Sequence, residues 1–77
     1  MEKIDRTNIR AVMNFLKNNK VLCLNGTFIR QDQTRENRFQ IENTYNGQNG
    51  KFERNRNWVK NFIKNDYLHL DLYLIGA

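Results

Sequence analysis

The stretch that decides the fold is YLHLDLYLI, residues 67–75. Leucine occupies every second position, at Leu68, Leu70, Leu72 and Leu74. Polar and aromatic residues alternate with the leucines, at Tyr67, His69, Asp71 and Tyr73. Alternation with a period of two is typical of a β-strand with one buried face and one partly polar face. The sequence therefore predicts a strand over residues 67–75 that closes a small sheet.

Two amphipathic helices are expected earlier in the chain. In the first, over residues 4–17, apolar residues follow the spacing of one buried helix face: Ile9, Val12, Met13 and Leu16. Asp5 is its expected N-cap, and Ile4 and Ile9 would form a hydrophobic staple. The second helix begins after a capping Asn55 or Asn57 and runs to about residue 65. Its apolar residues are Trp58, Val59, Phe62 and Ile63.

The segment between the helices has the pattern of an antiparallel sheet. Residues 21–24 and 27–29 are short apolar strands joined by Asn25-Gly26, which favours a type I′ hairpin turn. A polar loop over residues 31–37 precedes an alternating strand over residues 38–45, which places Phe39, Ile41 and Tyr45 on one face. A turn over residues 46–50 and a short return strand over residues 51–53 follow. Residues 1–77 are thus expected to form one α+β domain, in the order α-β-β-β-(β)-α-β, with three to five strands.

Composition excludes several classes of protein. The single cysteine, Cys23, cannot form an internal disulfide, and the charged N-terminus lacks the apolar stretch of a signal peptide. Apolar runs are too short to span a bilayer. We therefore expect a cytoplasmic protein with no membrane association, no cofactor and no metal site. The formal net charge of +5 favours a phosphate-bearing or acidic partner, although ordinary solubility also accounts for it.

The first candidate binding segment is basic and spans residues 51–64. It carries Lys51, Arg54, Arg56, Lys60 and Lys64 against one acid, Glu53. Basic side chains neutralise phosphates, and the interleaved aromatic rings at positions 52 and 58 could stack on bases. In the alternative interpretation the rings belong to the core and the charges form a solvated helix face.

Two further basic groups are weaker candidates. Arg6, Arg10 and Lys17 are expected on the outer face of the first helix, in a row that could follow a phosphate backbone or an acidic protein groove. The loop over residues 30–38 contributes three arginines, but two acids also lie within it. Its arginines are Arg30, Arg35 and Arg38.

The C-terminal stretch offers a different kind of surface. If both helices cover the leucine face, then Tyr67, His69 and Tyr73 lie on an exposed, partly aromatic sheet face that could bind a partner protein or unpaired bases. His69 beside Asp71, with Cys23 as nucleophile, would be a minimal catalytic set. A cysteine between two leucines is more often a small buried hydrophobe, so no catalytic residue is predicted.

The chain has thirteen asparagines and no proline. In this composition it resembles short phage-encoded and mobile-element-encoded proteins, inhibitors of host machinery and anti-CRISPR proteins among them. The resemblance implies a non-enzymatic binding protein that occupies a surface of a larger protein or nucleoprotein complex, in the host cytoplasm if phage-encoded. A basic nucleic-acid-binding regulator is the alternative, and a small ribonuclease toxin is a remote one. The sequence also leaves open a homodimer that forms through the C-terminal strand.

Overall fold

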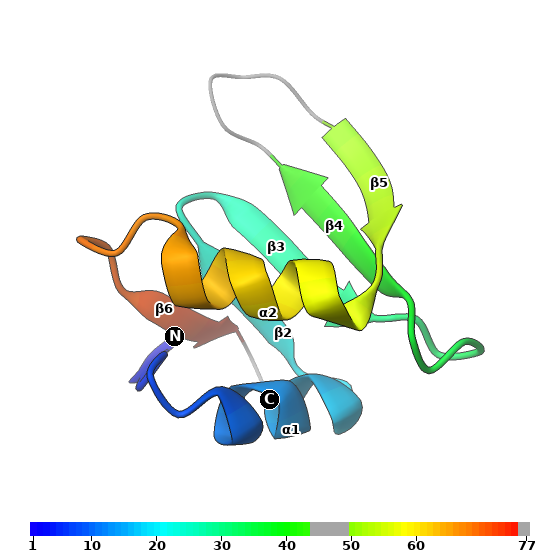
Figure 1. The fold of residues 1–77 in the computed structure, drawn as a ribbon, viewed down its shortest axis with the longest axis horizontal. Coiled ribbons are helices and arrows are strands. Elements are labelled where there is room, and N and C mark those ends of the chain that lie inside the picture. The colour runs from blue at the N-terminus through cyan, green and yellow to red at the C-terminus, as the bar shows by residue number, and fades with distance from the viewer. Residues whose placement is uncertain (44–49, 76–77) are drawn as a thin grey trace.

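In the computed structural model, which describes residues 1–43 and 50–75, two helices pack on an antiparallel sheet (Figure 1). The elements follow in the order β1 (Glu2–Ile4), α1 (Ile9–Lys17), β2 (Val21–Leu24), β3 (Thr27–Gln31), β4 (Phe39–Asn43), β5 (Gly50–Arg54), α2 (Arg56–Asn65) and β6 (Leu72–Ile75). The α+β class is confirmed. The expected three to five strands are wrong, because the described residues form six, and the order now begins with a strand.

The strands are arranged β1-β6-β2-β3-β4-β5, and each neighbouring pair is antiparallel. The last strand, β6, lies between β1 and β2, so the two ends of the chain meet in the sheet. β1 and β5 form the edges. The segment 72–75 is therefore an inner strand with a neighbouring strand on each side, and it does not form a sheet edge through which the suggested homodimer could pair.

Both helices cover the same face of the sheet (Figure 1). The strands contribute the buried side chains of Leu22, Leu24, Ile29, Phe39, Ile41 and Leu72. The helices contribute Val12, Met13, Leu16, Val59, Phe62 and Ile63. One layer of helix on one layer of sheet thus makes a single core, and the opposite face of the sheet is left without a covering helix.

The β2–β3 hairpin is confirmed with its predicted turn. Asn25 has φ 50° and Gly26 has φ 74°, the two positive values that a type I′ turn requires. Leu24 pairs with Thr27 directly beyond the turn. This turn fixes the register in which the leucines of β2 face the core.

The first helix begins five residues later than predicted, and residues 2–4 form strand β1 instead. Asp5 does not cap the helix, because its carboxylate accepts hydrogen bonds from the backbone N–H (2.9 Å) and hydroxyl (2.6 Å) of Thr7. These bonds lower the pKa of Asp5. Asn8 is the N-cap and accepts from the backbone N–H of Ala11. Ile4 pairs with Leu72 in the sheet, so the predicted staple is replaced by strand pairing.

The predicted strand over residues 67–75 is shorter in the structure, because only Leu72–Ile75 is extended. Tyr67 has φ 51°, in the left-handed region, and the N–H of Leu70 donates to its carbonyl. Leu68 is 68% exposed. Residues 67–70 therefore form the turn that reverses the chain after α2, and their alternation does not correspond to a strand.

The remaining elements agree with the prediction. Asn55 caps α2 by accepting from the N–H of Trp58 at 2.9 Å, and β5 provides the return strand beside β4. Phe39 and Ile41 face the core from β4, as expected. Tyr45 and most of the predicted turn over residues 46–50 lie outside the described residues, while Gly50, the last residue of that turn, is instead the first residue of β5.

Candidate functional site

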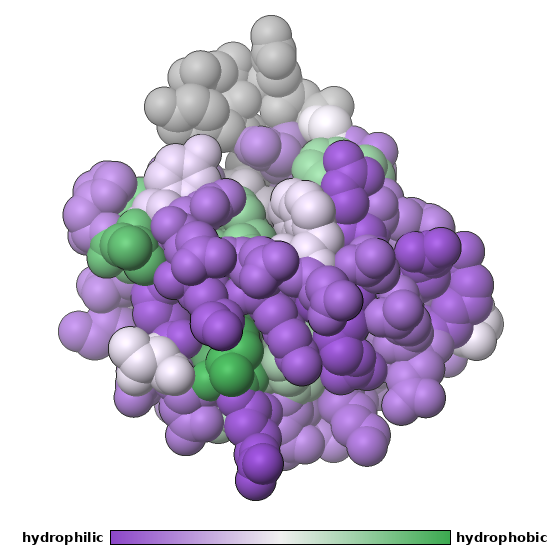
Figure 2. All heavy atoms as spheres, in the orientation of Figure 1, coloured by the Kyte–Doolittle hydropathy of each residue, from purple (hydrophilic) through white to green (hydrophobic). Residues whose placement is uncertain are grey.

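The surplus positive charge of the chain lies on its two helices. α1 and α2 together hold five of the thirteen basic residues and none of the eight acidic ones. The other eight basic residues are therefore matched by eight acids elsewhere. Figure 2 shows that hydrophilic side chains gather over α2 and that apolar surface is visible between α2 and α1. The net charge of +5 therefore equals the charge that the two helices carry.

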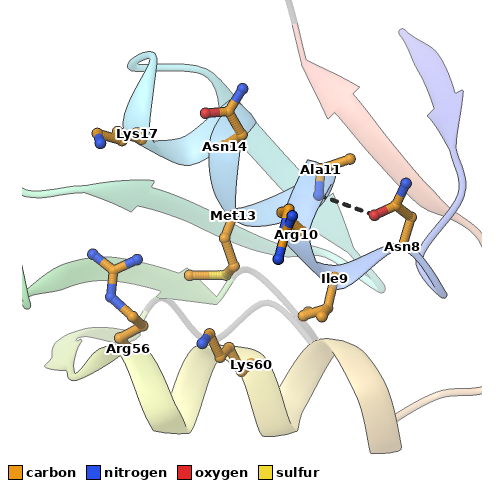
Figure 3. Close-up of a pocket in the computed structure, with 9 residues that line it drawn as sticks. All are labelled: Asn8, Ile9, Arg10, Ala11, Met13, Asn14, Lys17, Arg56 and Lys60. Carbon is orange, nitrogen blue, oxygen red and sulfur yellow. Dashed lines mark hydrogen bonds between the residues drawn. The ribbon is translucent and has the colours of Figure 1, made fainter.

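A groove of about 660 Å³ runs between α1 and α2. It is lined by Asn8, Ile9, Arg10, Ala11, Met13, Asn14, Lys17, Arg56 and Lys60. Arg56 and Lys60 project from α2, while Ile9 and Met13 point towards α2 from α1 (Figure 3). Arg10 also lines the groove from α1. Lys17 and Asn14 lie on the outer side of α1. None of these described lining residues is acidic, so the groove has four cations and no internal counter-charge.

The structure fixes Arg56 in place on its wall of the groove. Its backbone N–H donates to Oδ1 of Asn37 at 2.9 Å, and a guanidinium nitrogen lies 3.5 Å from the Glu36 carbonyl. The guanidinium carbon is 5.8 Å from the ring centroid of the buried Phe39, within the range of a cation–π contact. Arg56 is half-buried and already oriented, so little side-chain entropy is lost when an anion binds there.

Arg6 does not belong to this site, although the sequence placed it beside Arg10. It precedes α1, and its guanidinium donates to the carbonyls of Ile63 (2.6 and 3.0 Å), Tyr67 (2.7 Å), Leu70 (3.0 Å) and Asp66. These carbonyls end α2 and form the following turn. A cation at the negative end of a helix is favourable, so Arg6 is a structural residue.

None of the three loop arginines lines the groove. Arg35 forms ion pairs with Asp32 (2.9 Å) and with Glu53, across from the loop to β5. Hydrogen bonds from Arg35 and then from Thr34 hold the pKa of Asp32 well below its usual value. Arg35 and Gln40 lower the pKa of Glu53 in the same way. Arg35 is thus neutralised within the chain, and Arg38 is exposed on the same loop.

The uncovered face of the sheet holds another part of the predicted set. One row of paired residues crosses all six strands: Lys3, Tyr73, Cys23, Phe28, Glu42 and Lys51. Arg30 is exposed in the next row and shares a shallow hollow with Phe28 and Lys51. Tyr73 therefore lies on the uncovered face, where it is half-buried. Tyr67 and His69 do not, because they lie in the turn after α2.

The residues that were considered from the sequence as a catalytic set and rejected lie on different parts of the fold. Cys23 is half-buried in the middle of the uncovered face, where it pairs with Tyr73 and Phe28. His69 is exposed in the turn between α2 and β6. That the protein has no catalytic residue stays a prediction from the sequence.

Sequence reasoning missed a short repeat within α2. Residues 56–65 read RNWV-KNFI-KN, in which a cation, an asparagine, an aromatic ring and an aliphatic residue recur every four positions. Residues four apart lie on the same side of a helix, so each residue type forms its own row. The asparagine row consists of Asn57, Asn61 and Asn65, all exposed. The repeat is visible in the sequence, but the helix was predicted from its aliphatic and aromatic positions alone.

Comparison with known proteins adds no assignment: no family model, curated protein or solved structure matches the chain. Neither helix in the described part of the chain is long and apolar enough to cross a bilayer.

Proposed function

We propose that this is a non-enzymatic binding protein whose inter-helix groove binds the phosphate backbone of nucleic acid in the cytoplasm. The observation that carries the proposal is the acid-free groove with Arg10, Lys17, Arg56 and Lys60 around an apolar floor. Guanidinium and ammonium groups neutralise phosphates and release their condensed counterions, which drives association. Because charge elsewhere is balanced, the field of the molecule also directs a polyanion towards this face.

Salt dependence is the direct test of this function. Fluorescein-labelled single-stranded and duplex DNA and RNA are titrated with the protein at several salt concentrations, and affinity is read by anisotropy. Four phosphate contacts predict a slope of log K against log salt of about −3 for a single strand. Lys60→Glu should weaken binding to every sequence and reduce the slope by about 1.

Lys51→Glu is the matched control, because it changes the charge equally but lies on the uncovered sheet face. Its effect on affinity should be small beside that of Lys60→Glu. Equal losses in the two variants would show that only total charge matters. No binding of any probe at low salt would refute the proposed function.

A second candidate function is attachment to a protein surface of a larger complex, as a phage-type inhibitor would require. The observation that favours it is the uncovered sheet face, where Tyr73, Cys23 and Phe28 lie side by side in one row. Apolar and aromatic side chains on an uncovered face are typical of protein-binding surfaces.

The two functions respond to different substitutions. If the sheet face binds a protein, a stoichiometric partner should be retained from nuclease-treated lysate by the wild-type chain and by Lys60→Glu. Phe28→Glu should lose that partner, provided that circular dichroism shows an unchanged fold. A partner lost in Lys60→Glu and retained in Phe28→Glu would instead bind at the groove.

A further inference from the structure

The exposed side of α2 is divided into three rows of different chemistry. On one flank, Arg56 and Lys60 line the groove, and Lys64 continues their row. The asparagine row is next around the helix. The aromatic row follows on the flank away from the groove, where Trp58 is half-buried and Phe62 belongs to the buried core. The fourth row, Val59 and Ile63, is 0% exposed and anchors α2 on the core.

The aromatic flank is a built surface in which the rings support one another. Trp58 stacks on Phe62 with centroids 5.2 Å apart and planes 8° from parallel. Phe52 meets the Trp58 ring edge-on at 6.1 Å. The Arg54 guanidinium carbon lies 4.4 Å from the Phe52 centroid and 5.5 Å from that of Trp58. Trp58 is only half-buried. Phe62 stacks on one face of Trp58, so the accessible part of Trp58 and the exposed Arg54 guanidinium are the groups that a base can contact.

A hollow of about 170 Å³ joins this flank to the asparagine row. It is lined by Trp58, Asn61, Phe62, Asn65 and Asp66. The two amides supply both hydrogen-bond donors and acceptors, and Asp66 supplies an acceptor. Asp66 repels phosphate but can accept from the amino group of a base. The hollow thus suits a base edge, while the opposite flank of the same helix suits the backbone.

We propose that α2 binds single-stranded nucleic acid across its exposed side. The backbone lies on the cationic flank, the base edges meet the asparagines, and a base stacks against Trp58 and Arg54. This inference rests on the proposed function and specifies its ligand. Paired bases are stacked within a duplex and cannot reach the aromatic flank, so only unpaired nucleotides use all three rows.

Trp58 is the only tryptophan, so its fluorescence reports directly on the aromatic flank. The probes are single-stranded DNA and RNA of mixed sequence and the same sequences as duplexes, added to the full chain. Either single strand should quench Trp58 emission saturably and bind at least tenfold more tightly than its duplex. Asn61→Ala should lower single-strand affinity about tenfold with an unchanged salt slope, as expected for loss of base-edge hydrogen bonds.

Gln33→Ala is the matched control, because it removes an exposed amide in the loop before β4 and should leave affinity unchanged. Duplex binding equal to or tighter than single-strand binding would overturn this inference and leave the proposed function standing. Single-strand binding with no change in Trp58 emission and full affinity in Asn61→Ala would also overturn it. Failure of every probe to bind would refute the proposed function itself.

Discussion

Replacing Phe39 by alanine is expected to lower the free energy of unfolding by about 3–5 kcal/mol, the usual cost of removing a fully buried aromatic ring. Phe39 is 0% exposed and belongs to the single core between sheet and helices. A chain of 77 residues has a total stability of about 4–12 kcal/mol, so this loss brings the variant close to unfolding. Urea denaturation followed by circular dichroism measures it.

Phe39→Leu is the matched control for the same position. It keeps most of the apolar volume and should cost about 1 kcal/mol. Because the Phe39 ring also lies beneath the Arg56 guanidinium, the leucine variant should weaken oligonucleotide binding slightly while staying folded. A loss below about 1 kcal/mol in Phe39→Ala would contradict the central place of this ring in the core.

Replacing Arg6 by alanine is expected to cost about 2–3 kcal/mol, in the range of charge-assisted hydrogen bonds. Its guanidinium joins the N-terminal segment to the end of α2 and to the turn that carries the left-handed Tyr67. Without it, several carbonyls lose their donors at once. The melting temperature should fall by about 10–20 °C in calorimetry.

Two variants distinguish the hydrogen bonds of Arg6 from the effect of its positive charge. Arg10→Ala removes the same charge from an exposed position in the groove and should change stability by less than about 0.5 kcal/mol. Arg6→Lys keeps the charge but not the planar fork, so it should recover only part of the loss. Equal stability of Arg6→Ala and Arg10→Ala would show that the carbonyl contacts contribute nothing.

Local signals were sufficient for the elements whose conformation is determined by nearby residues. Asn25-Gly26 predicted the β2–β3 hairpin because only residues that tolerate positive φ suit that turn. Asn55 predicted the start of α2 because its side chain satisfies an N–H three residues away. In both cases the decisive contact lies within a few positions of the chain.

Long-range contacts determined the elements that were predicted wrongly. Strand β1 exists because Ile4 pairs with Leu72, and nothing near residue 4 reveals that partner. The turn after α2 is held by Arg6, about sixty positions earlier, so the alternation of leucines through Leu68 was misleading. Hydrophobic periodicity is a property of the segment alone, whereas the conformation of the segment also depends on the residues with which it packs.

The cations of the candidate site were predicted as binding residues, but not as members of one site. Arg10 and the α2 cations were identified in two separate candidate groups, and the packing of α1 beside α2 joins them in one groove. Arg6 and Arg35 have the same side chain as Arg56 but are held by carbonyls and carboxylates within the chain. Asp32 lies only three residues before Arg35, but Glu53 and the carbonyls that hold Arg6 are distant in sequence, so the sequence alone did not reveal them.

The repeat on α2 keeps its rows on separate sides only over a short helix. Four residues turn an α-helix by about 40° more than one full revolution, so each row rotates around the axis as it advances. One more repeat would bring the aliphatic row, at position 67, to the angle that Arg56 and Lys60 occupy, and an apolar side chain would enter the groove. α2 ends at Asn65, before this happens. The length of a binding partner that α2 can contact is therefore limited by the length of the helix.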